Sequence, residues 1–224
     1  MNVNSDLGEG AGSDEAILLS IDSANVCCGV HAGSASMTIE TARRCAELGV
    51  QVGAHPGYDD RENFGRVEVS LTPAEIEELI AFQVAALAAI APVAYIKPHG
   101  ALYHRCQRDR DAAGALVRVA SRFRIAVMGQ PDFEIVAAAN RAGIRAYREG
   151  FADRRMLADG TLAPRTQPDA VLDAGSAVRQ AVALAQTGRY DTLCIHGDTK
   201  GAPDIAVAIR KALRDAGIAN GRLA

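Results

Sequence analysis

The chain has 224 residues, of which 49% are hydrophobic and 23% are charged, and its formal net charge at pH 7 is −3. This composition is typical of a soluble globular protein, and the length suits one substantial core, so we expect a single domain over residues 1–224. With no basic stripe, no Trp and only 4% aromatic residues, the chain lacks the features of a nucleic-acid-binding protein.

No part of the sequence has the pattern of a membrane segment. No apolar run approaches the roughly 20 residues that span a bilayer. The segment from Met1 to Asp6 has neither the charged region nor the apolar region of a signal peptide. We therefore expect a cytoplasmic protein with no membrane partner.

The cysteine spacing indicates neither a disulfide framework nor a zinc knuckle. There are five cysteines, an odd number, and no two form a C-x-x-C pair. The adjacent Cys27 and Cys28 are most simply interpreted as small buried residues at a strand end, and a catalytic thiol is the less favoured alternative.

Predicted strands alternate with predicted helices along the whole chain. We expect strands at residues 2–5, 23–27, 50–54, 93–97, 124–128, 144–148 and 192–195. We expect helices after Ser13 or Asp14, from Ser34 or Ser36 to Leu48, from Thr72 to about Ile90, and at about 109–122, 131–142, 173–187 and 203–216. The clearest helix start is Thr72-Pro73-x-Glu75, which combines a capping hydroxyl, a proline in the first turn and an acid near the positive end of the helix dipole.

This alternation predicts a parallel sheet with right-handed crossovers. Seven strand–helix units suit either a closed seven-stranded (β/α) barrel or an open doubly wound sheet. Ionisable residues follow every predicted strand except the fifth, which ends at Met128-Gly129-Gln130. In a barrel these strand ends meet on one face, whereas an open sheet would scatter some of them, so the pattern favours the barrel. The residues concerned are Asp6, Glu9, His31, His55, Lys97, His99, Glu149, Asp153, His196 and Asp198.

The stretch from Tyr95 to Tyr103 shows the strand-end pattern most clearly. An apolar run ends in Lys97, and Pro98 stops the strand because proline cannot donate to a sheet ladder. Lys97 and His99 then project from the carboxyl end of the strand. A surface turn is the plain alternative, but the same pattern recurs along the chain. His104 is different and is expected to be an exposed residue at a helix start.

Several strand-end residues have both a structural and a chemical interpretation. Asp6 and Glu9 flank a glycine, which suits ordinary turn chemistry and equally a general base or metal ligand. Asp153 and Arg154 suit a surface ion pair, or an arginine that holds a carboxylate by two hydrogen bonds. Lys97 and Arg154 together suit a small anionic substrate or a phosphoryl group.

The sequence also limits the type of reaction. The glycine-rich loop at Asp6–Gly10 is not followed by Gly-Lys-Ser/Thr, so it is not a Walker A motif and does not place ATP. No nucleophilic serine elbow is present. The site is therefore interpreted as suited to water or phosphate chemistry and not to an acyl-enzyme.

Six motifs, in order along nearly the whole chain, resemble the LamB/YcsF family. They are Asp6-Leu-Gly-Glu-Gly, Ser23-Ala-Asn-Val-Cys-Cys-Gly-Val-His31-Ala-Gly, Gly53-Ala-His-Pro-Gly-Tyr58, Lys97-Pro-His-Gly-Ala-Leu-Tyr103, Phe151-Ala-Asp-Arg154 and His196-Gly-Asp198. The chain departs from the family pattern at Ser5, where cysteine is usual, and at Val30, where phenylalanine is usual.

The resemblance implies a deacetylase-like, distorted TIM barrel of seven strands. It also implies ATP-dependent hydrolysis of 5-oxo-L-proline to L-glutamate, performed together with two partner subunits, B and C. On this hypothesis Lys97 and Arg154 bind the substrate carboxylate or phosphoryl oxygens. His31, His55, His99 and His196, with Asp6 and Asp198, hold the water, a proton or a divalent ion. If a metal is bound, its ligands are expected among Asp6, His31, His55 and His196.

Two other functions remain open at this point. One is a metal-dependent amide hydrolase that acts alone, as polysaccharide deacetylases do, since clustered Asp and His suit zinc or a similar ion. The other is a non-catalytic subunit that lends a substrate pocket to its partners.

Overall fold

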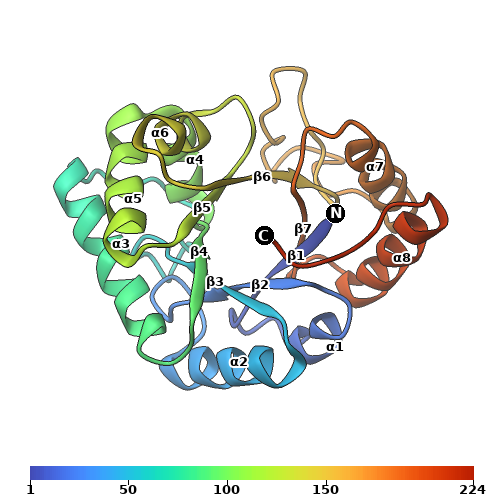
Figure 1. The fold of residues 1–224 in the computed structure, drawn as a ribbon, viewed down its shortest axis with the longest axis horizontal. Helices are drawn as coiled ribbons and strands as arrows, with labels where there is room; N and C mark the ends of the chain where they lie inside the picture. The colour runs from blue at the N-terminus through green and yellow to red at the C-terminus, as the bar shows by residue number, and fades with distance from the viewer.

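The computed structural model describes residues 1–224, and its seven parallel strands close into a barrel ringed by helices (Figure 1). The strands pair in chain order, and β7 pairs with β1 to close the ring. This confirms the closed barrel over the open sheet. The strands are β1 (Asn2–Leu7), β2 (Ser23–Cys27), β3 (Gln51–His55), β4 (Val93–Ile96), β5 (Ala126–Gly129), β6 (Ala146–Phe151) and β7 (Thr192–His196).

The helices begin and end largely where the capping residues predict. Thr72 and Glu75 form a reciprocal capping box at the start of α3, and Ser34 accepts a hydrogen bond from the backbone of Met37 at the start of α2. Gly49 ends α2 in the left-handed conformation. The helices are α1 (Asp14–Leu18), α2 (Ala35–Leu48), α3 (Pro73–Ala88), α4 (Gly100–Arg108), α5 (Arg110–Phe123), α6 (Glu134–Ala142), α7 (Ala174–Gln186) and α8 (Ala202–Asp215).

Helix α4 is the one element that the sequence interpretation missed. Asp109 has extended backbone angles, and its carboxylate accepts hydrogen bonds from the backbone of Asp111 and Ala112 at the start of α5. This residue therefore ends one helix and caps the next. Because no glycine or proline separates the two helices, only the second start was visible in the sequence. His104 is exposed as expected, but it lies inside α4 and not at a helix start.

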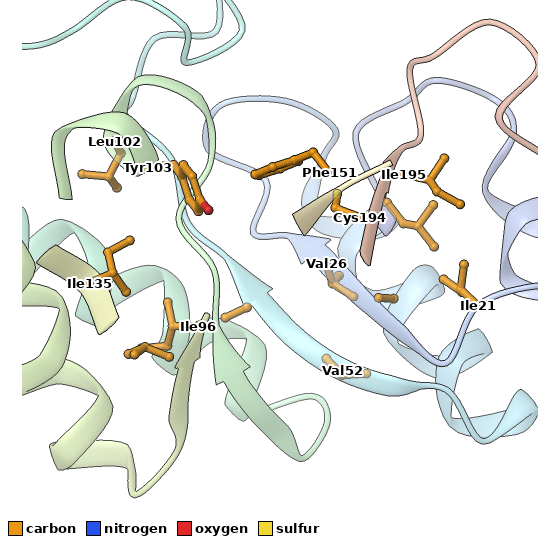
Figure 2. Packing of buried hydrophobic residues seen from close by; sticks show 14 of the residues in the cluster. Ile21, Val26, Val52, Ile96, Leu102, Tyr103, Ile135, Phe151, Cys194 and Ile195 are labelled. Atoms are coloured by element: carbon orange, nitrogen blue, oxygen red, sulfur yellow. The ribbon is translucent and has the colours of Figure 1, made fainter. Parts of the chain in front are cut away.

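The apolar core lies between the barrel wall and the helices. Figure 2 shows Ile96 of β4 with Leu102 of α4 and Ile135 of α6, and all three side chains are fully buried. They belong to one continuous cluster of 47 buried residues that surrounds the barrel, so the helices are held to the strands mainly by burial of apolar surface. No helix of the structure has the length and apolar character needed to cross a membrane.

The inside of the barrel, in contrast, is polar. Alternate residues of β1 point inward, and Asn4 donates to the hydroxyl of Thr192 at 2.7 Å. Asn25 donates to both Asn4 and Asp6, at 2.7 and 2.8 Å, and accepts from the hydroxyl of Tyr95 at 2.8 Å. This chain of hydrogen bonds runs up the barrel and ends at Asp6, so it holds that carboxylate from below.

The N-terminal end of the barrel is crossed by residues 219–224, here called the closing tail. In Figure 1 the two termini lie near the middle of the ring. The backbone of Leu223 exchanges hydrogen bonds of 2.7 and 3.1 Å with the side chain of Gln51, and the hydroxyl of Tyr147 donates to Ala224 at 2.7 Å. The closing tail thus ties β3 and β6 together across the opening.

Candidate active site

Strand register brings the predicted residues to the carboxyl end of the barrel. Asp6 lies opposite Asn25 of β2 and His196 of β7, and Cys27 lies opposite His55 of β3. Of the ten residues to which the sequence interpretation gives a chemical role, His196 is partly buried and Asp198 is exposed. The other eight are buried, namely Asp6, Glu9, His31, His55, Lys97, His99, Asp153 and Arg154.

The ammonium group of Lys97 is the centre of the first cluster. Its Nζ lies 2.9 Å from Asp6 Oδ1, 2.8 Å from Glu149 Oε1 and 3.0 Å from Cys194 Sγ. Tyr103 donates its hydroxyl to the other oxygen of Glu149 at 3.1 Å. Lys97 thus donates hydrogen bonds to Asp6 and Cys194 and forms an ion pair with Glu149. Its assignment to a substrate anion stays a prediction.

Burial and charge act against one another on these groups. Burial alone would raise the pKa of Asp6, but the nearby Lys97 ammonium holds it well below its ordinary value. Burial would likewise lower the pKa of Lys97, and the two carboxylates keep it well above its ordinary value. For Glu149 burial outweighs the ion pair with Lys97, and its pKa is raised. Lys97 is thus held as a cation beside the ionised Asp6.

The second cluster joins three histidines to Glu9. Glu9 Oε1 lies 3.2 Å from His31 Nε2, 3.1 Å from His99 Nδ1 and 3.7 Å from His55 Nε2. The His55 and His99 nitrogens are 3.0 Å apart. Burial lowers the pKa of His55 to about 3, so its ring is neutral at pH 7. This buried group of one carboxylate and three imidazoles could hold a metal ion, and so could the smaller group of Asp6, Cys194 and His196.

The metal set expected from the sequence is divided between these two groups. His31 and His55 lie with Glu9 and His99, whereas Asp6 and His196 lie with Cys194. The groups are neighbours, because Asp6 Oδ2 is 3.6 Å from His55 Nε2.

His196 is oriented by a buried carboxylate. Its Nδ1 lies 2.9 Å from Asp153 Oδ1, while Asp153 Oδ2 accepts from the His196 backbone at 3.0 Å and from the Thr199 hydroxyl at 2.5 Å. Burial would raise the pKa of Asp153, but His196 and Thr199 hold it below its ordinary value. The remaining ring nitrogen, Nε2, points toward Asp6 at 3.9 Å. The arrangement matches the way a carboxylate fixes a catalytic imidazole.

Two predicted residues have other partners at the rim. Arg154 donates to the carbonyl oxygens of Ala163 and Ala170, at 2.6 and 3.1 Å, and so holds the loop that follows β6. Asp198 accepts from Arg66 at 2.6 Å and from Arg165 at 3.1 Å. These two arginines converge at the mouth of the site, and their side chains are 38% and 27% exposed.

Six residues of the site were given no role from the sequence. Glu149 had been noted only at its strand end, and the other five are Asn25, Arg66, Tyr103, Arg165 and Cys194. The available signal was the alternation of Asn2, Asn4 and Asp6, which shows that the inside of β1 is polar. Polar partners on neighbouring strands follow from that alternation once the register is known.

Comparison with known proteins agrees with these features. The family model described as the LamB/YcsF family matches residues 1–224. The chain belongs to the LamB/YcsF family. A protein of Nocardia farcinica, named as the A subunit of 5-oxoprolinase, is 41% identical over 242 residues, which cover 97% of each chain. A protein of Chloroflexus aggregans with the same name is 40% identical and covers 97% of this chain and 96% of its own.

Solved structures of other proteins share the barrel. The crystal structure of the lactam utilization protein from Thermus thermophilus has a TM-score of 0.91 and 35% identity, and covers 100% of this chain and 99% of its own. The T48 deacetylase has a TM-score of 0.59 at 14% identity, over 99% of this chain and 86% of its own. The second likeness shows the fold alone and confirms the deacetylase-like barrel.

Proposed function

We propose that this chain is the A subunit of an ATP-dependent 5-oxoprolinase, which opens 5-oxo-L-proline to L-glutamate together with subunits B and C. The observation that carries the proposal is similarity along the entire chain to proteins named as this component of 5-oxoprolinase. The buried acid–imidazole groups at the strand ends support it, because they are suited to proton transfer beside a small polar substrate.

The use of ATP has a chemical reason. A five-membered lactam is a resonance-stabilised amide and a poor electrophile. Transfer of a phosphoryl group from ATP to the lactam oxygen makes the ring carbon electrophilic, and water adds there. The ring C–N bond then breaks as the nitrogen takes a proton, and hydrolysis of the resulting acyl phosphate releases glutamate and phosphate.

We assign the proton transfers to His196. Its Nδ1 is held by Asp153, which leaves Nε2 to accept a proton from water or to deliver one to the ring nitrogen. Lys97 is assigned to fixing Asp6 and Glu149. We assign the binding of the substrate carboxylate or a phosphoryl group to Arg66 and Arg165 at the exposed mouth, and not to Lys97 and Arg154.

The test is glutamate release from 5-oxoproline by the reconstituted three-subunit enzyme, with and without ATP and with each component omitted in turn. We expect release only when ATP and all three subunits are present. Release by this chain alone without ATP would instead identify a metal-dependent amide hydrolase. Activity that persists in the partners without this chain would identify a non-catalytic subunit.

Substitutions in the same assay test the residue roles. His196→Asn should lower kcat by about 10²–10⁴-fold because it removes the proton-transferring nitrogen. Lys97→Ala and His55→Ala should also impair the enzyme, whereas His104→Ala, at an exposed histidine, should not. Full activity of His196→Asn would refute its assignment.

A further inference from the structure

We propose that Glu9 Oε1, His55 Nε2 and His99 Nδ1 are three ligands of a divalent cation of the zinc class, and that His31 positions Glu9. All three ligands belong to this chain, so metal binding can be tested without ATP and without the partner subunits. These ligands differ from the metal ligands expected from the sequence. Asp6 is excluded because its carboxylate is neutralised by Lys97 and accepts a hydrogen bond from Asn25.

Backbone carbonyls determine which ring nitrogens carry hydrogen. His55 Nδ1 lies 2.8 Å from the carbonyl oxygen of Lys97, and His99 Nε2 lies 2.9 Å from the carbonyl oxygen of Phe64. A carbonyl oxygen only accepts, so each of these nitrogens is the protonated one. In the neutral rings the opposite nitrogens, His55 Nε2 and His99 Nδ1, therefore present lone pairs. Histidines that bind metals usually donate their other N–H to such a carbonyl.

Three lone-pair atoms consequently face one another in a buried space. The three separations are 3.0 Å between the histidine nitrogens, 3.1 Å from His99 to Glu9 and 3.7 Å from His55 to Glu9. Atoms that all carry lone pairs repel at such distances unless a proton or a metal cation lies among them. Ligand atoms bound tetrahedrally to zinc at about 2.0–2.1 Å are about 3.3–3.4 Å apart, so the triangle has the size that such an ion requires.

The ring orientations separate the ligands from the neighbouring histidine. The planes of His55 and His99 are 88° apart, so their lone pairs reach a common point from different directions. His31 stacks on His99 with planes 7° apart and centroids 3.9 Å apart. An ion in the plane of His99 therefore lies well outside the plane of His31. His31 Nε2, 3.2 Å from Glu9 Oε1, serves instead as a donor that orients the carboxylate.

The chain is also built to bring these rings together. Gly65 has φ +64°, and a Cβ there would lie 2.9 Å from His31 Cβ and 3.2 Å from His99 Cδ2. The absent side chain lets the loop carrying the Phe64 carbonyl pack directly on the rings. Two imidazoles and one carboxylate form a known ligand set of catalytic zinc, in which one coordination position stays open.

Metal binding by the purified chain tests the proposal directly. After chelation and dialysis the wild type is titrated with Zn²⁺ and with Co²⁺ alone, and bound metal is measured by elemental analysis, visible absorption of Co²⁺ and X-ray absorption. We expect about one ion per chain with imidazole ligands at about 2.0–2.1 Å. A folded wild type that binds no ion, or one without imidazole ligands, would overturn the proposal, and this arm needs no variant.

The variants distinguish ligands from the positioning residue. Glu9→Gln and His99→Gln should abolish stoichiometric binding, while His31→Ala should weaken it about 10–100-fold and keep the Co²⁺ spectrum. His104→Ala removes a histidine outside the site and should bind like wild type. Circular dichroism establishes that each variant is folded. Wild-type affinity in folded Glu9→Gln or His99→Gln would refute the ligand set, and loss of the wild-type spectrum in His31→Ala would refute its positioning role.

Discussion

At the scale of single residues, the site is governed by the cost of burying charge. A buried ion stays charged only where partners replace its water, and Lys97 has Asp6, Glu149 and Cys194 within 3.0 Å. The same rule explains why Asp153, fully buried, accepts three hydrogen bonds. These residues depend on one another, so single substitutions are expected to cost more than paired ones.

Lys97→Met should lower the free energy of unfolding by about 3–5 kcal/mol at pH 7, because it leaves two buried carboxylates without their cation. Adding Glu149→Gln to Lys97→Met should recover part of that loss by removing one uncompensated charge. Urea unfolding of wild type, both single variants and the double variant measures the coupling. Additive losses in this cycle would show that Lys97 and Glu149 do not stabilise one another.

At the scale of the elements, close contacts between neighbouring strands stabilise the barrel wall. Gly53 of β3 lies against the ring of Tyr95 of β4, and a Cβ at Gly53 would approach Tyr95 Cε2 to 2.1 Å. Asp191 lies just before β7, and its carboxylate accepts hydrogen bonds of 2.8–3.0 Å from the backbone N–H and the guanidinium of Arg148 in β6. Each contact joins two neighbouring strands.

Gly53→Ala should destabilise the protein by about 1–3 kcal/mol, because the methyl group must displace Tyr95 and its hydrogen bond to Asn25. The matched control is Gly114→Ala in α5, where the nearest atom to the new Cβ is the flexible end of Arg118 at 3.3 Å. There the substitution should stabilise by about 0.5–1 kcal/mol, since alanine favours the helix. Thermal and urea unfolding measure both. Equal effects of the two substitutions would contradict the role of Gly53.

Asp191 should contribute a stability that depends on pH. Burial raises its pKa, but the hydrogen bonds from Arg148 outweigh this and hold the pKa below its ordinary value. A depressed carboxyl pKa stabilises the fold above the unfolded value of about 3.9, and the contribution is lost as pH falls through the folded pKa. Asp191→Asn should therefore cost about 1 kcal/mol at pH 7, since its side chain is 32% exposed, and less at pH 3.

Urea unfolding of wild type and Asp191→Asn at both pH values checks this difference. Asp132→Asn is the control, because Asp132 pairs with Arg189 at an exposed position and should cost little at either pH. A cost for Asp191→Asn that grows as the pH is lowered would have the opposite sign to the one expected.

At the scale of the whole molecule, closure of the barrel gives it two open ends. The candidate site lies at the carboxyl end of the strands, and the closing tail crosses the other end. The strand ends converge at one mouth, where the acids and histidines meet. At the other mouth the closing tail bonds to residues of β1, β3 and β6 through its backbone. The tail therefore acts on the barrel as a brace between strands distant in sequence.

Deletion of residues 219–224 should lower the free energy of unfolding by about 3 kcal/mol, since several hydrogen bonds of about 1 kcal/mol each are lost. Arg222→Ala is the control, because it changes a side chain and keeps the tail backbone. Urea unfolding measures both variants. A deletion that leaves stability at the wild-type value would show that the tail does not brace the barrel.

The order and type of the elements followed from linear pattern, because helix capping and hydrophobic spacing are local. Thr72 and Glu75 marked a helix start that the structure confirms, and the recurrence of ionisable residues after strands predicted the closed barrel. The local pattern missed α4, where Asp109 ends one helix and caps the next. It also placed the sixth strand at 144–148, whereas β6 runs from Ala146 to Phe151 and contains Glu149.

The partners of each charged residue were decided by tertiary structure. Only the closed ring and its register place Glu149 beside Lys97, divide the expected metal set and direct His99 toward Glu9. The physical reason is that hydrogen bonds and ion pairs act over about 3 Å, whereas these residues are tens of positions apart in the chain. Sequence order tells which groups reach the mouth of the barrel, and packing selects which of them meet.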